Sequence, residues 1–317
     1  MTGLMAIFWK ELADNLYSKR FIVLFLIMYA GGIAAIYVAA QNIRQSILSA
    51  GDTPFIFIRL FILSGENMPF SFPFFLSLFV PILGMALGFD AINSERTSGN
   101  LSRILSQPVY RDSVINGKFL AGLATISILV ITIFIVVGGL GIRMIGVPPT
   151  AEELLRLFTF IFITIVFGAF WLALANLFSV LLHRGATSLI ASLAIWLFLF
   201  FFLGMLANGI ASSVVPITDS SSIELISKWD SIYSPIMHIS PITLYGETVQ
   251  SLLMPDMQNV TARLMMMYGD YSSSLVPLPM RESLISVWPQ MVTLIALSAI
   301  CFAISYIRFM REEIRAT

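Results

Sequence analysis

A charged and polar segment, residues 90–118, lies between two long apolar runs. Its acidic and basic side chains can form charge-assisted hydrogen bonds, which are stronger than bonds between neutral groups. A protein dissolved wholly in lipid has no need of such a segment. A membrane protein that is driven by a soluble partner needs a stiff element that extends into water and takes up the force that the partner exerts. The chemistry predicted for the segment is therefore charged contact with another protein.

Glycine, leucine and proline positions predict a short helix within this segment. Gly99 can relax the backbone into a turn. Leu101, Ile104 and Leu105 then fall at i, i+3 and i+4, on one face of a helix. Pro108 should end that helix, because the residue before a proline disfavours the helical conformation. The sequence thus predicts a helical element over residues 100–107.

A second helix should follow and run into the bilayer. Asp112 or Ser113 can cap its N-terminus. Read in order, the whole segment carries Glu95-Arg96, Gly99, Leu101, Leu105, Pro108, Arg111 and Gly117-Lys118.

This pattern closely resembles the signature between the second and third spans of type-2 ATP-binding-cassette (ABC) exporter permeases. In that family the segment forms a cytoplasmic coupling helix that docks on the ATPase subunit. The resemblance extends more loosely, through the order of spans, over essentially the whole chain. The alternative is an ordinary cytoplasmic loop whose charges only obey the topology rule. The ATPase-coupling residues that the resemblance implies in the 93–118 segment are Glu95, Arg96, Gly99, Leu101, Arg103, Leu105, Pro108 and Arg111.

Composition indicates a membrane protein. Of 317 residues, 58% are hydrophobic and 11% are charged, against about 25% charged in soluble domains. Basic and acidic residues balance at 18 each, so bulk charge gives no argument for nucleic acid or another anionic partner. Cys301 is the single cysteine, which excludes a disulfide or a thiolate metal cluster within one chain.

Six apolar runs are long enough to cross a bilayer, which takes about 20 residues. The sequence therefore predicts an all-α polytopic membrane protein with six transmembrane helices. With the N-terminus inside, the inner segments carry more Lys and Arg than the longer outer ones. The positive-inside rule then places both termini in the cytoplasm of a multi-pass plasma-membrane protein. The runs cover residues 21–40, 72–92, 119–142, 157–182, 186–207 and 287–307.

Residues 1–20 have an amphipathic pattern that suits a helix lying in the membrane interface. The alternative is an amphipathic helix packed on another segment of protein. The apolar stripe consists of Met5, Phe8, Trp9, Leu12 and Leu16, with charged and amide side chains opposite.

A long connection, residues 208–286, joins the fifth and sixth spans on the predicted outer side. Connections are typically about 4 to 6 residues, so this one is expected to have structure of its own. Helical periodicity over residues 242–253 and 260–268 predicts a partly helical extracellular cap that packs on the membrane surface.

The six runs carry no ionisable residue in their central portions. Proton- and sodium-coupled carriers commonly keep such groups there, because a charge at the bilayer centre costs about 2.5–3.5 kcal/mol or more and persists only for function. The driving energy is therefore expected to enter elsewhere. Phe119 follows Gly117-Lys118, so the chain lacks a Gly-x-x-x-x-Gly-Lys-Ser/Thr loop. No cofactor is expected in this chain, and ATP and Mg²⁺ are expected to bind a partner ATPase.

Few side chains could hold a metal. His183 and His238 lie on opposite sides of the membrane in this topology. Thioethers suit Cu(I), but methionine is also an adaptable filler of apolar surfaces, and the second use is favoured here. No metal site is predicted. The methionines of the outer region are Met237, Met254, Met257, Met265, Met266, Met267 and Met280.

Together, the charge-free spans and the resemblance predict the permease subunit of an ABC exporter rather than an enzyme. The expected partners are an ABC ATPase subunit, a second permease and the lipid membrane, with no nucleic acid. Two alternatives are a membrane scaffold or assembly factor that acts through the outer region, and a secondary carrier. The substrate is left open, because a cavity lined by Phe, Leu, Met and Ile admits lipids, apolar drugs and peptides alike.

Overall fold

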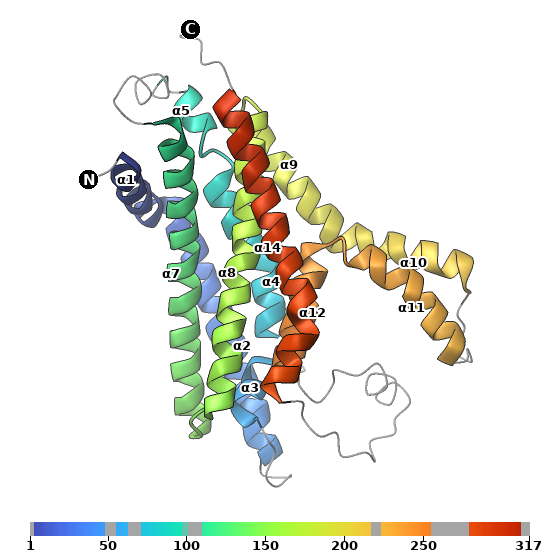
Figure 1. The fold of residues 1–317 in the computed structure, drawn as a ribbon. Helices are drawn as coiled ribbons and strands as arrows, with labels where there is room; N and C mark the ends of the chain where they lie inside the picture. The colour runs from blue at the N-terminus through green and yellow to red at the C-terminus, as the bar shows by residue number, and fades with distance from the viewer. Residues whose placement is uncertain are drawn as a thin grey trace.

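The structure is a computed structural model that describes residues 3–47, 55–62, 71–97, 99, 110–216, 223–254 and 279–311. All regular elements among these residues are helices, packed as an upright bundle with one arm that leaves it sideways (Figure 1). In chain order they are α1 (Gly3–Tyr17), α2 (Lys19–Ile47), α3 (Ile56–Ile62), α4 (Phe72–Gly88), α5 (Asn93–Thr97), α7 (Arg111–Ile145), α8 (Ala151–Leu181), α9 (Gly185–Leu197), the π-helical η1 (Phe198–Phe202), α10 (Leu203–Val214), α11 (Ile223–Met237), α12 (Pro241–Leu253) and α14 (Met280–Arg311).

The six predicted spans are confirmed: the described residues contain six helices long and apolar enough to cross a membrane. Several extend beyond the apolar runs, since α7 begins at Arg111 and α14 at Met280. Helix α5 and the end of α14 lie at one end of the bundle, with α1 close by, and α3 lies at the other end (Figure 1). That the end with α5 faces the cytoplasm stays a prediction.

Helix α8 is the centre of the bundle and packs against α4, α7, α12 and α14. Its closest approach to α4 is at two glycines four residues apart. A Cβ atom at Gly84 would lie 2.9 Å from the carbonyl oxygen of Gly168, and one at Gly88 would lie 2.8 Å from that of Leu172. Small residues at this spacing let membrane helices approach closely. Helices α4 and α8 are therefore packed backbone to backbone.

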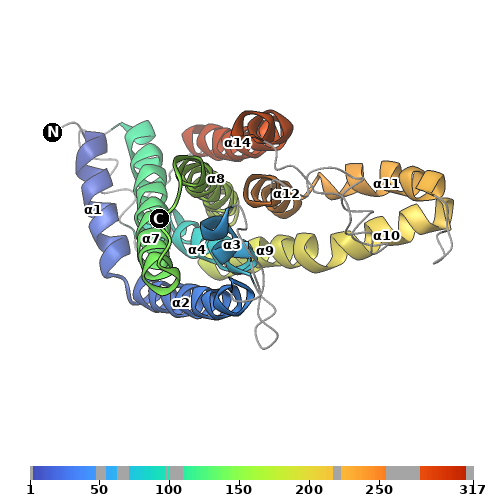
Figure 2. The same cartoon turned by 90° about the horizontal axis from the view of Figure 1, so that it is seen from below.

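The fifth span is not one straight helix. Helix α9 slants away from the bundle, and beyond η1 the chain continues into α10, which lies beside α11 in the projecting arm (Figures 1 and 2). Trp229 of α11 donates its indole N–H to Ser212 of α10 (Nε1 to Oγ, 3.2 Å). A π-helical turn interrupts the regular hydrogen-bond ladder and often marks a functional site. The arm is thus joined to the bundle through an irregular turn.

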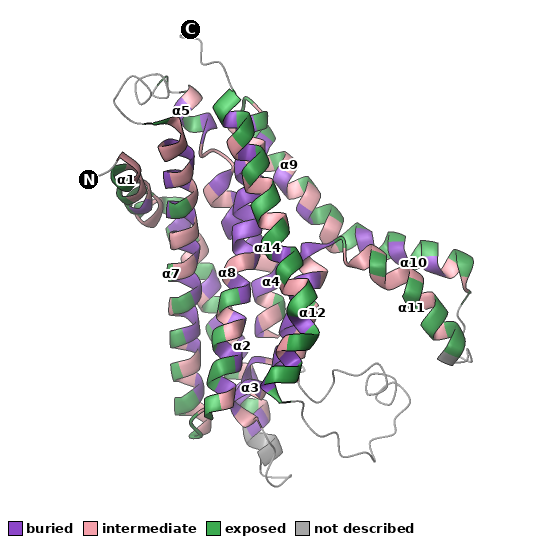
Figure 3. Ribbon diagram, viewed as in Figure 1, coloured by how far each residue is buried: buried purple, intermediate pink, exposed green. Residues whose placement is uncertain are grey.

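The described part of residues 208–286 is helical, as predicted, but α12 does not pack on a membrane surface. It lies in the bundle, and many of its residues are buried (Figure 3). The ring of Tyr245 stacks on Phe167 of α8 with centroids 4.3 Å apart, and its hydroxyl lies 3.1 Å from Oγ1 of Thr164. Apolar residues at helical spacing suit a protein core as well as a membrane surface, which explains the wrong expectation. Residues 260–268 lie outside the described residues.

A buried arginine fixes α12 at its C-terminal end. Arg156 of α8 is fully buried, and its Nη1 donates to the carbonyl oxygen of Leu252 (2.9 Å) and to Oγ of Ser283 on α14 (3.2 Å). Its Nη2 donates to Oε1 of Glu152 (2.7 Å). A cation suits the last carbonyls of a helix, which carry a partial negative charge. Arg156 therefore ties α12 to both α8 and α14.

Helix α1 is amphipathic as predicted, and it also packs on α7. Gly117 of α7 faces Ile7, where a Cβ atom would lie 2.9 Å from the Ile7 side chain. Leu12 is buried, whereas Met5 and Trp9 remain exposed. The two interpretations of residues 1–20 are thus compatible: one side contacts protein, and the exposed apolar residues are free to meet lipid headgroups.

Candidate functional site: an ionic junction in the predicted coupling segment

The structure describes four of the eight residues expected to couple to an ATPase. Gly99 has a φ of 71° in an exposed turn, a conformation that favours glycine. Arg96 is half-buried, and its Nη1 donates to Oδ1 of Asn93 (3.4 Å). Arg111 is half-buried at the first position of α7. The other four, Leu101, Arg103, Leu105 and Pro108, lie outside the described residues together with the predicted 100–107 helix.

The start of α7 differs from the sequence expectation. Its N-cap is Tyr110, which has extended backbone and makes no side-chain cap bond. Asp112, expected as a cap, accepts instead from the backbone N–H of Ser113 (2.7 Å). Helix α7 therefore begins two to three residues earlier than a cap at either position would allow. A carboxylate in the first turn still complements the positive end of the helix dipole.

A buried ion pair cluster lies where α1, α5 and α7 meet. Lys118 of α7 donates to Glu11 of α1 (Nζ to Oε1, 2.8 Å) and to Glu95 of α5 (Nζ to Oε1, 3.2 Å). The three side chains are only 6%, 17% and 11% exposed, in that order. We call Glu11, Glu95 and Lys118 the ionic junction. It joins residues far apart in the sequence, and two of the three lie in residues 93–118, the segment predicted to couple to an ATPase, which we call the coupling segment.

The electrostatics of the junction stabilise it while all three charges are present and make the loss of any one of them costly. Two carboxylates share one buried ammonium, and removing one partner of a buried pair costs about 3–5 kcal/mol because the other charge is left uncompensated. Lys10 supports the cluster from the surface, with Nζ 3.3 Å from Glu11 and 3.9 Å from Glu95. Partial burial lowers the pKa of Lys10, but Glu11, Glu95 and Asp14 outweigh this and raise it above its usual value of 10.5.

Two further contacts hold the entry to the coupling segment. Ser179 of α8 accepts at Oγ from the backbone N–H groups of Ile92 (3.0 Å) and Asn93 (3.2 Å). These groups lie at the N-terminus of α5, where no carbonyl of the helix itself can satisfy them. Arg20 of α2 donates to Asp90 (Nη1 to Oδ2, 2.8 Å). The entry is thus attached to α2 and α8 as well as to α1 and α7.

The junction changes how Glu95 is understood. The resemblance implies that Glu95, Arg96 and Arg103 are among the coupling residues, and contact with a partner stays a prediction for all three. The Glu95 carboxylate, however, is turned toward Lys118 and mostly buried. In the sequence, Glu11 is one charged residue of the first helix and Lys118 is one member of the motif. Their opposite charges were a signal, but nothing in the sequence indicated which pairs of charges would meet.

Among the residues that the structure describes, the remaining candidates do not gather into a metal site. His183 is exposed in the turn between α8 and α9, and His238 lies beside Glu247, with Nε2 2.9 Å from Oε2. Within the described residues there is no group of three or more His, Cys, Asp or Glu side chains placed to hold a metal ion. Met237 and Met254 line an apolar cavity, and Met280 is buried at the start of α14. Met257 and residues 265–267 lie outside the described part of the chain.

The chain is similar to one family of known proteins. The profile of the ABC-2 family transporter proteins matches residues 5–314, a range that holds most of α1, the three junction residues and the six candidate spans. No curated protein sequence matches the chain. The match covers nearly the full length of the chain. The chain therefore belongs to the ABC-2 family of transporter proteins.

Proposed function

We propose that the chain is the permease of an ABC exporter, working as a pair of permeases driven by ATPase subunits on a separate chain. Family membership makes it a membrane subunit of an ABC transporter and implies an ATPase partner. The observation that supports the coupling role is the ionic junction, in which two residues of the coupling segment, Glu95 and Lys118, tie the short helix α5 to α7 and α1.

The proposed mechanism is mechanical. Closure of the ATPase subunits on ATP displaces the segment between α5 and α7. Buried ion pairs resist separation, so α5, α7 and α1 move together rather than the segment bending alone. Ser179 and the close contact of α4 with α8 pass the movement to the centre of the bundle. The expected result is a path for substrate between two permeases, with no ATP or Mg²⁺ bound by this chain.

A secondary carrier is the second candidate, because one observation favours it. The His238–Glu247 pair lies beside the spans: Glu247 is on α12 and accepts from Gln290 of α14 (Nε2 to Oε2, 3.4 Å). Both residues lie outside the six apolar runs, whose central portions carry no ionisable residue. A carrier would transport without an ATPase, so co-purification of an ATPase separates the two functions. Co-purification of an ATPase would also distinguish an ABC transporter from a membrane scaffold.

Charge reversal in the coupling segment tests the proposal. The permease is co-expressed with a candidate ABC ATPase from its own genome, and the complex is purified in nanodiscs. Arg103→Glu, expected to meet the ATPase, should weaken association by about tenfold or more, since a lost interfacial charge pair costs about 2–5 kcal/mol. Arg143→Glu, on the exposed far end of α7, is the matched control and should leave association unchanged.

Two outcomes would contradict the proposal. Unchanged association and transport in Arg103→Glu would reduce the segment to a topological loop. Equal loss in Arg143→Glu would show that the effect is not located at the predicted cytoplasmic end. Labelling of a cysteine at position 103 by an impermeant maleimide, applied outside intact cells, would overturn the topology itself.

A further inference from the structure

A polar cavity of about 400 Å³ lies between α11, α12 and α14. Three helices contribute polar side chains to it at helical spacing. Helix α12 contributes Thr243 and Glu247, four residues apart, and α14 contributes Ser286 and Gln290, also four apart. Asp230 enters from α11. Residues at i and i+4 share one face of a helix, so each helix turns a polar stripe toward the same space.

The charges around this cavity are unbalanced. Its described lining includes the carboxylates of Asp230 and Glu247 and the imidazole of His238, with no Lys or Arg. Glu247 accepts from His238 (2.9 Å) and from Gln290 (3.4 Å). An ionised carboxylate has about four lone-pair sites, so Glu247 has capacity for a further donor. The buried Oε1 of Gln290 has no hydrogen-bond partner.

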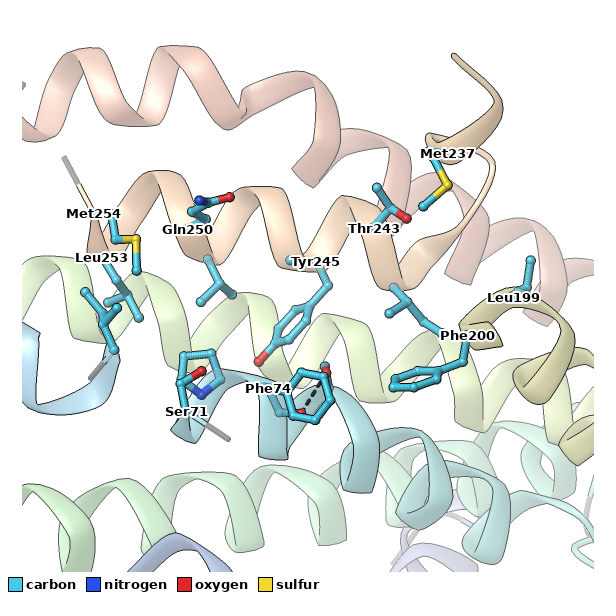
Figure 4. Close-up of a pocket in the computed structure, with 16 residues that line it drawn as sticks. Ser71, Phe74, Leu199, Phe200, Met237, Thr243, Tyr245, Gln250, Leu253 and Met254 are labelled. Carbon is cyan, nitrogen blue, oxygen red and sulfur yellow. Dashed lines mark hydrogen bonds between the residues drawn. The ribbon is translucent and has the colours of Figure 1, made fainter. Parts of the chain in front are cut away.

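An apolar cavity of about 500 Å³ lies on another side of α12. Figure 4 shows Phe74 of α4, Phe200 of η1 and Tyr245 of α12 around it. The described residues that line it include none with a formal charge. Aromatic side chains provide large apolar surfaces and attract cations to their faces. This space suits the apolar body of a small molecule.

The two cavities adjoin at the junction of α11 and α12. Met237 and Thr243 line both. We propose that together they form one binding site for a cationic amphiphile, with its ammonium-type group near Asp230 and Glu247 and its apolar body against Phe74 and Phe200. The described lining holds two carboxylates and no Lys or Arg, so charge complementarity favours a ligand cation over an anion. That this ligand is the transported substrate rests on the proposed function; its binding does not.

Equilibrium binding to the full-length permease in nanodiscs, without ATP, tests the site. The probes are rhodamine 6G, an apolar cation, and rhodamine B, which has the same ring system but a carboxylate that cancels its charge at neutral pH. Fluorescence polarisation should show saturable binding of rhodamine 6G above empty nanodiscs. Rhodamine B should bind at least about tenfold more weakly, as expected from unfavourable charge juxtaposition.

Variants locate the binding. Glu247→Gln and Asp230→Asn should each raise the Kd for rhodamine 6G about tenfold, and Phe200→Ala should weaken both probes alike. Glu224→Gln is the matched control: it removes an acidic charge from the same helix as Asp230, but Glu224 is 77% exposed and paired with Lys228 (2.8 Å). It should not change the Kd.

Three results would overturn the site: no saturable binding, equal binding of the two probes, or an unchanged Kd in both acidic variants. Asp230 is exposed on the arm, so Asp230→Asn should fold even if another variant does not. Because the measurement needs neither ATP nor an ATPase, loss of ATPase association and loss of this site give separate signatures.

Discussion

The ionic junction and the polar cavity use the same kinds of side chain in opposite ways. In the junction, Lys118 lies between two carboxylates and is almost completely buried. In the cavity, Glu247 and His238 are 30% and 41% exposed, and the carboxylates have no Lys or Arg among the described lining residues. Charges that are buried and mutually paired hold helices together. Charges that remain accessible and unbalanced are available to a ligand.

The largest expected effect comes from comparing the loss of a buried ion pair with the loss of an exposed one. Lys118→Met removes the buried ammonium that Glu11 and Glu95 share, and should cost about 3–5 kcal/mol of unfolding free energy. Lys228→Met breaks a pair of equal length, 2.8 Å, between side chains that are 60% and 77% exposed. It should cost at most about 1 kcal/mol. Reversible unfolding in mixed micelles measures both, and similar losses would contradict the comparison.

A smaller effect is expected at Glu95. In Glu95→Gln, Lys118 keeps Glu11 as its partner, so the loss should be about 1–3 kcal/mol, as for a hydrogen bond to a charged group. Coupling should fall: ATPase activity should respond less to substrate while expression stays near normal. Glu95→Lys is a poorer test, because it would place a second cation beside Lys118 and damage the junction itself. If ATPase activity in Glu95→Gln still responded fully to substrate, the junction would have no role in transmitting force.

Glu247→Gln should leave the stability and the ATPase association of the complex nearly unchanged. The His238 and Glu247 side chains are partly solvated, and such pairs contribute at most about 1 kcal/mol. Transport of a cationic amphiphile should nevertheless fall. Loss of ATPase association in this variant, at normal expression, would show that the two regions are not separate in function.

The smallest effect is expected at Lys10, which is 60% exposed. Its pKa is raised above 10.5, so its stabilising contribution is complete below the unfolded value and is lost only as pH rises through the folded value. The stability difference between wild type and Lys10→Gln should therefore be small and constant between about pH 7 and 9.5. A difference that shrank within this range would contradict the assigned partners.

The number of spans could be predicted from sequence because a span depends on the length and polarity of one continuous run. The charged segment between the second and third spans was also visible as a local pattern. The packing of α4 on α8 could have been suspected, since Gly84 and Gly88 have the spacing of close helix contacts. These features are local in sequence.

The features that could not be predicted from the sequence depend on contacts between residues far apart in the chain. Glu11 and Lys118 are 107 residues apart, and composition does not indicate which of many opposite charges will meet. The position of α12 was missed for a related reason: Tyr245 and Val249 are as consistent with a surface cap as with a core. Placing α12 in the bundle is what brings Glu247 beside Gln290, so the cavity could not be predicted without it.

The central claim is that the Glu95–Lys118 pair joins α5, at the start of the coupling segment, to α7. A double-mutant cycle with Glu95→Gln, Lys118→Gln and the double variant tests it most directly, with unfolding free energy and substrate-stimulated ATPase activity as readouts. The account predicts an interaction energy of about 1–3 kcal/mol in stability and a double variant less impaired than the sum of the single ones. The Glu224–Lys228 pair provides a control cycle with an interaction below about 0.5 kcal/mol. Additive effects at Glu95 and Lys118, within about 0.5 kcal/mol, would contradict the claim.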